Sequence, residues 1–194
     1  MKYASDQFIH CQARYLPTQQ HFQNTFVYGQ NTIYLRQQLW AHLEDIAHNI
    51  QEAWCILGDF NAVLQPDEQI GGKEIHISEI TDFAQCIENC YLQEARSIGV
   101  FYTWTNKTVW SRIDKFLANS QWCDAFNYTH IRCLPEGLSD HSPLKFGFPS
   151  CPKQKGSFQF GEMWTNDPQF SSIVQHVCSQ KYRGSKMHQL YDLL

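Results

Sequence analysis

Short apolar runs alternate with only two long helical patterns between residues 7 and 148, and this mixture most constrains the fold. The run at residues 54–57 ends at Gly58, which is typical of a buried strand followed by a turn. Residues 32–50 repeat apolar side chains at three- and four-residue steps, which predicts an amphipathic helix. The mixture favours an α/β fold with sheets packed on each other and helices outside.

The remaining elements are assigned from the same patterns. Strands are expected at residues 7–15, 21–29, 54–57, 101–105, 112–117, 130–134 and 144–148. Helices are expected at residues 32–50, 78–89, 119–126, 168–180 and from 186 onward, with Ser78 capping the second.

The sequence character changes at residue 149, where a linker of Cys, Pro, Lys, Gln, Gly and Ser begins. We expect one domain at residues 1–149 and a linker with a helical segment at residues 150–194. The 43% hydrophobic content is enough for a sizeable core. The net charge of -4 argues against a passive nucleic-acid-binding module, which is usually basic.

The N-terminal sequence and the cysteine spacing indicate where in the cell the protein is located. The first six residues contain no apolar signal region, and no apolar run approaches the roughly 20 residues that span a bilayer. The eight cysteines are scattered, without a C-x-x-C pair. We therefore expect reduced, mostly buried thiols in a nuclear or cytoplasmic protein that is not secreted. The sequence implies no membrane association and no obligate protein partner.

Three polar blocks carry the candidate chemistry, and the first follows the strand at residues 54–57. Gly58 allows a sharp turn, after which Asp59 and Asn61 point the same way because they are two residues apart on extended chain. A carboxylate can accept a proton from water, and a nearby amide can hold that water or a phosphate oxygen. The alternative is a simple Asx-type turn.

The second block is residues 111–116, in which Arg112 and Asp114 share one strand face and Ile113 faces the core. Its alternative is a surface ion pair on an edge strand. The third block is residues 139–143, where Asp140 and His141 are adjacent. A carboxylate is a hard ligand for Mg²⁺, and an imidazole can hydrogen-bond or protonate a phosphoryl oxygen. The alternative is a loop with a lone histidine.

The order of the three blocks resembles that of the endonuclease/exonuclease/phosphatase superfamily. Residues 26–31 and 102–106 are similar to the retrotransposon branch of that superfamily, and residues 6–11 to its plant non-LTR (LINE-type) members. Residues 158–164, with Phe170, Val174 and Gly184, resemble the connector that precedes a reverse transcriptase. The resemblance implies a four-layer α-β-β-α sandwich, of which this chain is a part without the opening strands.

The resemblance also implies catalytic roles. Asp59 would activate or orient the attacking water, and Asn61 would hold it together with a phosphate oxygen. Asp114 would pair with His141 and fix its tautomer. His141 would contact the scissile phosphate.

The remaining roles concern the cofactor and the substrate. Asp140 would lie beside Mg²⁺ (or Mn²⁺), and Tyr28 would stabilise charge on the phosphate with Asn31 nearby. Trp104 would flank the DNA groove. Tyr28 can equally be a half-buried strand aromatic, and Trp104 a core residue.

The family's first metal-site residues, an Asn and a Glu on opening strands, have no counterpart in this sequence. Loss of metal-dependent charge stabilisation costs orders of magnitude in rate. We therefore expect a fragment of a Mg²⁺-dependent DNA endonuclease from a retrotransposon reading frame, inactive on its own. The alternatives are a residually active endonuclease or phosphodiesterase and a non-catalytic nucleic-acid-binding remnant.

Overall fold

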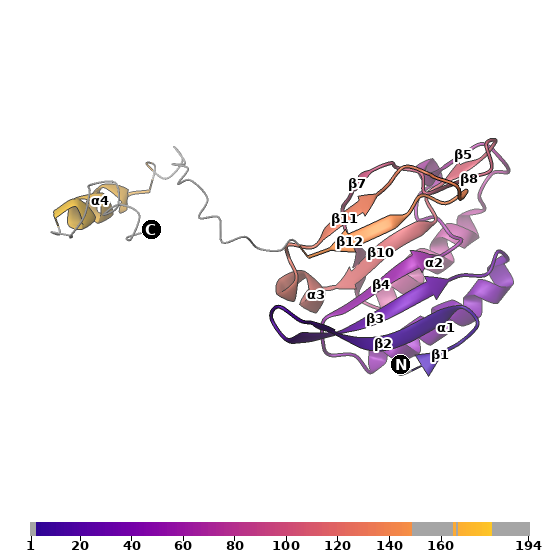
Figure 1. Ribbon diagram of the computed structural model, residues 1–194, viewed down its shortest axis with the longest axis horizontal. Coiled ribbons are helices and arrows are strands. Elements are labelled where there is room, and N and C mark those ends of the chain that lie inside the picture. The colour runs from indigo at the N-terminus through magenta and orange to yellow at the C-terminus, as the bar shows by residue number, and fades with distance from the viewer. Residues whose placement is uncertain (1–2, 149–164, 166, 180–194) are drawn as a thin grey trace. The chain divides into compact units, whose positions relative to one another are not determined.

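The computed structural model describes residues 3–148, 165 and 167–179 (Figure 1). The chain divides into two compact units, Met1–Pro149 and Ser150–Leu194. In the second unit, helix α4 occupies Phe170–Ser179, close to the predicted helix at 168–180. The predicted helix from residue 186, and the connector residues other than Phe170 and Val174, lie outside the described residues.

The first unit is built on a six-stranded sheet with the order β1-β2-β3-β4-β10-β6. Its strands are β1 (Tyr3–Ala4), β2 (Phe8–Tyr15), β3 (Gln20–Tyr28), β4 (Trp54–Asp59), β10 (Asp114–Asn119) and β6 (Leu92–Glu94). β3 and β4 are parallel, and the other neighbours are antiparallel. The parallel pair ends at Tyr28 and Asp59, and this edge of the sheet carries the candidate site.

Two helices, α1 (Ile33–His48) and α2 (Ile77–Asn89), cover one face of this sheet (Figure 1). Leu39 and Leu43 of α1 and Phe83 of α2 are at most 1% exposed in the core cluster. The predicted amphipathic pattern of α1 is therefore confirmed, since its regular apolar side chains face the sheet. The N-cap of α2 is His76, so the prediction of Ser78 as the cap is wrong.

The opposite face of the large sheet is partly covered by a second, three-stranded sheet and a short helix. The second sheet has the order β12-β11-β7, with β7 (Ser97–Gly99), β11 (His130–Cys133) and β12 (Leu144–Gly147). Helix α3 (Ser120–Ala125) begins as predicted at Asn119, whose side chain accepts the Trp122 N–H. Phe116, Trp122 and Ile131 form the shared core. The chain is thus a mixed α/β protein with packed sheets and helices outside.

A third sheet is small and has the order β5-β9-β8. It contains β5 (Gln69–Ile70), which follows the 3-10 helix η1 (Pro66–Glu68), β9 (Trp110–Ser111) and β8 (Trp104–Thr105). The predicted strand at 101–105 is shorter than expected, and the one at 112–117 begins at Asp114. The N–H of Arg112 binds the carbonyl oxygen of Glu68 at 2.8 Å, which extends the pairing of β9 with β5 by one residue before β10 begins.

Part of the large sheet's second face is uncovered by the described residues. Ile9 and Phe26 lie directly opposite each other on β2 and β3 and are 48% and 46% exposed. The six cysteines within residues 3–148 are all free, and Cys55, Cys86, Cys90 and Cys133 are buried. No described helix combines the length and the apolar character needed to cross a membrane.

Candidate active site

Asp59 and Asn61 form a fixed turn at the end of β4. Gly58 has φ +138°, and a Cβ there would lie 2.0 Å from the Val27 carbonyl oxygen, so a side chain cannot be accommodated. The Asp59 carboxylate accepts the Asn61 backbone N–H at 2.8 Å and its side-chain N–H at 3.0 Å. The Asn61 amide also donates to the Gly29 carbonyl at 2.8 Å. The Asx turn and the shared direction of the two side chains are therefore both present.

Strand register brings the first two blocks together. Asp59 pairs with Tyr28 on β3 and with Asp114 on β10, so the three residues stand side by side across neighbouring strands. β10 lies between β4 and β6, so it is not an edge strand. Because Asp114 is the register partner of Asp59, the two residues lie at the same end of the strands.

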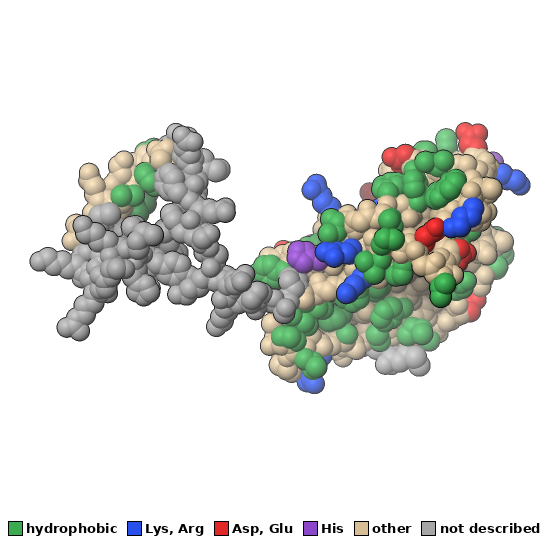
Figure 2. All heavy atoms as spheres, turned by 45° about the horizontal axis from the view of Figure 1, so that its top comes forward, with side chains coloured by type: hydrophobic (Ala, Val, Ile, Leu, Met, Phe, Trp, Pro, Cys, Tyr) green, Lys and Arg blue, Asp and Glu red, His purple; other side chains and the backbone are tan. Residues whose placement is uncertain are grey.

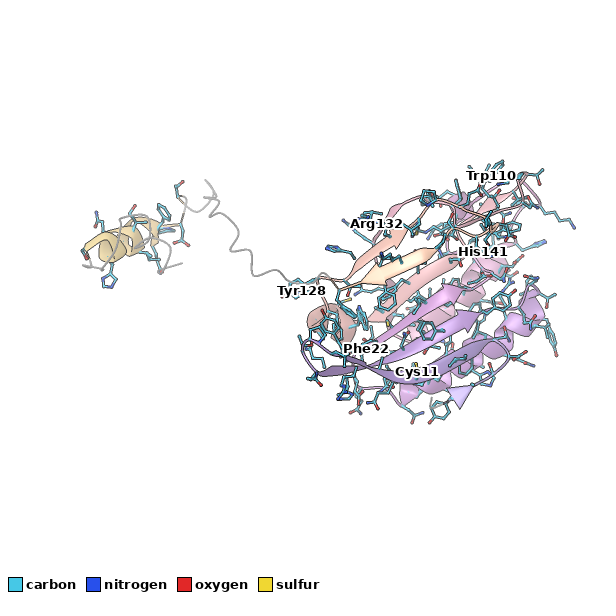
Figure 3. The ribbon with its side chains drawn as sticks, in the orientation of Figure 1. Cys11, Phe22, Trp110, Tyr128, Arg132 and His141 are labelled. Carbon is cyan, nitrogen blue, oxygen red and sulfur yellow. The ribbon has the colours of Figure 1, made fainter. Side chains whose placement is uncertain are left out.

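His141 joins this pair from the loop before β12. Its Nδ1 lies 3.0 Å from Asp114 Oδ2, and its Nε2 lies 3.9 Å from Asp59 Oδ2. The contact with Asp114 favours the tautomer with the proton on Nδ1, which leaves Nε2 facing Asp59. Figure 3 shows His141 near the end of the sheet where β3 and β4 finish.

A buried threonine and a tryptophan hold the His141 loop in place. The Thr103 hydroxyl oxygen accepts the backbone N–H groups of Ile113 and Asp114, and the Thr103 carbonyl accepts the N–H of Ser142. Trp104 forms an isolated bridge with His141. These bonds fix Asp114 and His141 relative to each other, and the importance of Thr103 was not predicted because its bonds join segments ten and more residues apart.

Trp104 also contacts the predicted metal residue. Its indole N–H donates to Asp140 Oδ2 at 2.9 Å. This bond is the main reason that the pKa of Asp140 is lowered from its ordinary value. Trp104 thus orients a carboxylate, which the sequence did not predict.

Burial and a second carboxylate act on Asp59, which is 7% exposed. Burial raises its pKa to about 6, and the charge of Asp114 acts in the same direction. The Asn61 N–H, His141 and Arg36 oppose the rise. A carboxyl group that changes charge near neutral pH is suited to exchange a proton with water.

These residues surround a cavity of about 500 Å³. Of the predicted site residues, all but Asp114 line it: Tyr28, Asn31, Asp59, Asn61, Trp104, Asp140 and His141. Gln69, Ser111 and Ile113 line it as well and were not predicted as site residues. The Ser111 hydroxyl is buried and has no hydrogen-bond partner among the residues that the structure describes. Its only sequence signal was its place next to Arg112.

A buried ion-pair network lies behind the cavity. The Lys115 ammonium, with a fully buried side chain, binds both oxygens of Glu68 at 2.7 and 2.8 Å. Arg112 binds Glu94 at 2.6 Å and lies 3.4 Å from Glu68. The interpretation of Arg112 as part of a surface pair on an edge strand is therefore wrong, because its side chain is only 13% exposed.

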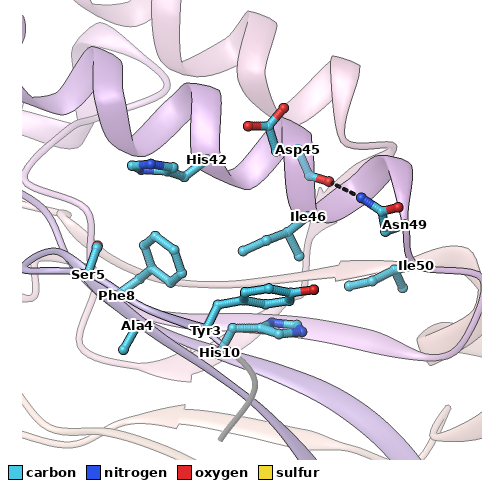
Figure 4. Close-up of a pocket in the computed structure, with 10 residues that line it drawn as sticks. All are labelled: Tyr3, Ala4, Ser5, Phe8, His10, His42, Asp45, Ile46, Asn49 and Ile50. Carbon is cyan, nitrogen blue, oxygen red and sulfur yellow. Dashed lines mark hydrogen bonds between the residues drawn. The ribbon is translucent and has the colours of Figure 1, made fainter.

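A second cavity, of about 430 Å³, lies between α1 and the β1–β2 pair (Figure 4). Its lining shares no residue with the predicted site. The rings of Tyr3 and His10 lie 5.9 Å apart, and those of Phe8 and His42 5.6 Å apart. It contains an acidic side chain from Asp45 but none of the three polar blocks, so the candidate chemistry belongs to the first cavity.

The donor groups at the first cavity fit one side of a metal site. Among residues 3–148, 165 and 167–179, no group of three or more His, Cys, Asp and Glu could hold a metal. Mg²⁺, however, often uses one or two carboxylates and completes its octahedron with water. Asp140 is exposed, and its Oδ2 accepts the Trp104 N–H at 2.9 Å while its Oδ1 accepts the Ser139 hydroxyl at 3.4 Å. Asp140, Asp59 and Asn61 line the same cavity, and of its two carboxylates Asp140 is the exposed one.

Comparisons with solved structures show the fold. The endonuclease domain of TRAS1, a telomere-specific non-LTR retrotransposon, is 14% identical with a TM-score of 0.54, over 74% of this chain and 64% of that one. Beta toxin from Staphylococcus aureus is 14% identical with a TM-score of 0.53, over 73% and 56%. The 3′ phosphatase NExo from Neisseria, bound to a product DNA hairpin, is 20% identical with a TM-score of 0.51, over 66% and 61%.

The chain therefore spans between 56% and 64% of the length of these structures. No curated protein matches its sequence significantly. A model of the endonuclease/exonuclease/phosphatase family matches residues 12–141, which is more than half of the chain. The matched segment contains the three polar blocks up to His141. The protein belongs to the endonuclease/exonuclease/phosphatase family.

Proposed function

We propose that this chain carries part of the active site of a divalent-metal-dependent DNA endonuclease of the retrotransposon type. The observation that supports this function best is the convergence of three separate segments. His141 lies 3.0 Å from Asp114 and 3.9 Å from Asp59, beside a cavity lined by polar groups. Hydrolysis of a phosphodiester bond needs such a constellation of proton acceptor, oriented imidazole and phosphate-binding groups.

Asp59 is the group that accepts a proton from the attacking water. Its partner Asn61 has an amide nitrogen already bonded to Asp59 and Gly29, which holds its side chain at the cavity wall. The Asn61 carbonyl oxygen then remains to orient the water. Tyr28 and Asn31, which line the same cavity, contribute contacts to the phosphate.

His141 contacts the scissile phosphate through Nε2. Asp114 accepts a hydrogen bond from the Nδ1–H of His141 and so holds the imidazole in one orientation. Nε2 then points toward the cavity. Protonated Nε2 then donates a hydrogen bond to a phosphoryl oxygen as charge develops there.

Asp140 is the metal ligand of this chain, and Asp59 lines the same cavity. A bound Mg²⁺ or Mn²⁺ supplies charge neutralisation at the phosphate. Because Asp140 is the one exposed carboxylate at this cavity among the described residues, this chain on its own binds the metal weakly. We propose that it is therefore a poor catalyst alone, far below the roughly 1–10³ turnovers per second of ordinary enzymes.

Nicking of supercoiled DNA tests the catalytic assignment. We expect slow nicking that requires Mg²⁺ or Mn²⁺, is lost in His141→Ala and is retained in the control His21→Ala, which changes an exposed histidine on β3. Equal nicking by both variants would show that a contaminant cuts the DNA. Turnover at ordinary enzyme rates would contradict the assignment of weak metal binding.

A second measurement applies where nicking is too slow to follow. The imidazole NMR signals of His141 should shift when a short DNA duplex is added, whereas those of His21 should not. Absence of both nicking and this shift overturns the proposed function and leaves a remnant without a working site.

A further inference from the structure

The outer face of the three-stranded sheet carries a cluster of basic side chains without acidic partners. We call it the basic strip and define it as Arg96, His130, Arg132 and Lys145. All four are exposed, and none of the ion pairs found among the described residues involves Arg96, Arg132 or Lys145. The strands β7, β11 and β12 contain no Asp or Glu.

Alternation along the strands decides which way these side chains point. Ile131 and Cys133 of β11 are buried, and Phe146 of β12 packs against the same core cluster. Because successive side chains in a strand face opposite sides, Arg132 and Lys145 face outward. Figure 2, turned so that the top of Figure 1 comes forward, shows blue and purple side chains gathered on this side of the domain.

Arg132 and Lys145 are also direct cross-strand partners on β11 and β12. Like charges placed directly opposite each other destabilise an antiparallel pair. Ile98, the β7 partner of Arg132, is 59% exposed and contributes no charge. The repulsion is thus uncompensated in the described protein, and an anion bridging the two side chains would relieve it.

The strip begins close to the candidate active site. The carbonyl oxygen of Pro143, two residues after His141, accepts the N–H of Leu134. The next two residue pairs are Cys133 with Leu144 and Arg132 with Lys145. The strip then continues along β11 to His130, away from the cavity. The protein as a whole has a net charge of -4, so this local excess of cations is a feature of one face.

We propose that the basic strip binds backbone phosphates of DNA outside the catalytic cavity, with Arg132 and Lys145 sharing one phosphate or two adjacent ones. A phosphate between the two cations replaces their repulsion by two attractions, which is the charge complementarity that nucleic-acid surfaces use. The choice of DNA as the occupant rests on the proposed function. The proposed contacts are to backbone phosphates, which are the same at every base sequence, so the strip positions DNA without reading its sequence.

Lys145→Glu provides a sharp test because it should change folding and DNA binding in opposite directions. An ion pair with Arg132 replaces the like-charge pair, so the melting temperature should rise. The same change removes up to two phosphate contacts, so the slope of log K against log salt should become shallower by about 1–2 between roughly 50 and 200 mM NaCl. Lys73→Glu is the control, since it changes the net charge equally on an exposed loop.

Binding is measured by fluorescence anisotropy with a labelled DNA duplex in EDTA, where neither metal binding nor hydrolysis contributes. Failure of the proposed function would abolish nicking but not this salt dependence, so the two failures are distinguishable. The inference is overturned if the slope of log K against log salt is the same in Lys145→Glu as in the parent. It is also overturned if Lys73→Glu changes that slope by the same amount as Lys145→Glu. Absence of salt-dependent binding by the parent overturns it as well. Should Lys145→Glu not fold, Lys145→Gln must still make the slope shallower by about 1.

Discussion

Asp59 and Asp114 lie directly opposite each other on β4 and β10, and the imidazole of His141 contacts both, at 3.9 and 3.0 Å. Two neighbouring carboxylates repel each other, and their repulsion helps to raise the pKa of Asp59 to about 6. The arrangement opposes folding at neutral pH and is therefore a cost that the site imposes on the domain.

The first prediction concerns Asp59 and pH. Because the pKa of Asp59 is higher in the folded protein, the native state binds more protons than the unfolded chain between about pH 4 and 6. The stability that this group contributes is therefore present at low pH and is lost as the pH rises through about 6. Relative to the parent, Asp59→Asn should gain up to about 3 kcal/mol between pH 4 and pH 7. Urea unfolding at several pH values measures it, and a pH-independent difference would refute the shift.

The second prediction concerns Thr103, which is fully buried. Thr103→Val keeps the side-chain shape but leaves the N–H groups of Ile113 and Asp114 without their acceptor. We expect a loss of about 1–3 kcal/mol of unfolding free energy. The control Thr81→Val, on the exposed face of α2, should change it by less than about 0.5 kcal/mol. Equal effects would show that Thr103 has no special role.

The third prediction concerns the buried ion pair. Lys115→Met removes the nearer cation from the buried Glu68 carboxylate, which keeps Arg112 at 3.4 Å, and should cost up to about 3–5 kcal/mol. Lys107 makes a comparably short pair with Glu136, but their side chains are 72% and 43% exposed. Lys107→Met should therefore cost less than about 1 kcal/mol. Chemical denaturation of both variants gives the comparison, and similar losses would argue against the burial effect.

The fourth prediction concerns the Trp104–Asp140 bond. Trp104→Phe keeps an aromatic ring and removes the N–H that lowers the pKa of Asp140. The pKa of Asp140 should rise toward its ordinary value in a carboxyl NMR titration. Trp110→Phe, which changes a 39% exposed indole on β9, serves as the control. An unaltered Asp140 titration in Trp104→Phe would show that the bond does not form in solution.

Local sequence patterns were sufficient for the main elements. The spacing of Leu39 and Leu43 predicted α1, and the apolar run before Gly58 predicted β4. Both signals depend only on residues that are close together in the sequence. The resemblance carried by the order of the three polar blocks implied which side chains would lie around one site. The distances among Asp59, Asp114 and His141 are consistent with that prediction.

Only the tertiary structure decided which groups support and surround those residues. The bonds of Thr103 and the pairing of Lys115 with Glu68 join segments that are far apart in sequence. The burial of the Ser111 hydroxyl likewise depends on the packing around it. Strand register also placed Arg132 opposite Lys145, which no periodicity indicates. The physical reason is that side-chain alternation is encoded locally, whereas register and loop contacts depend on how the whole sheet packs.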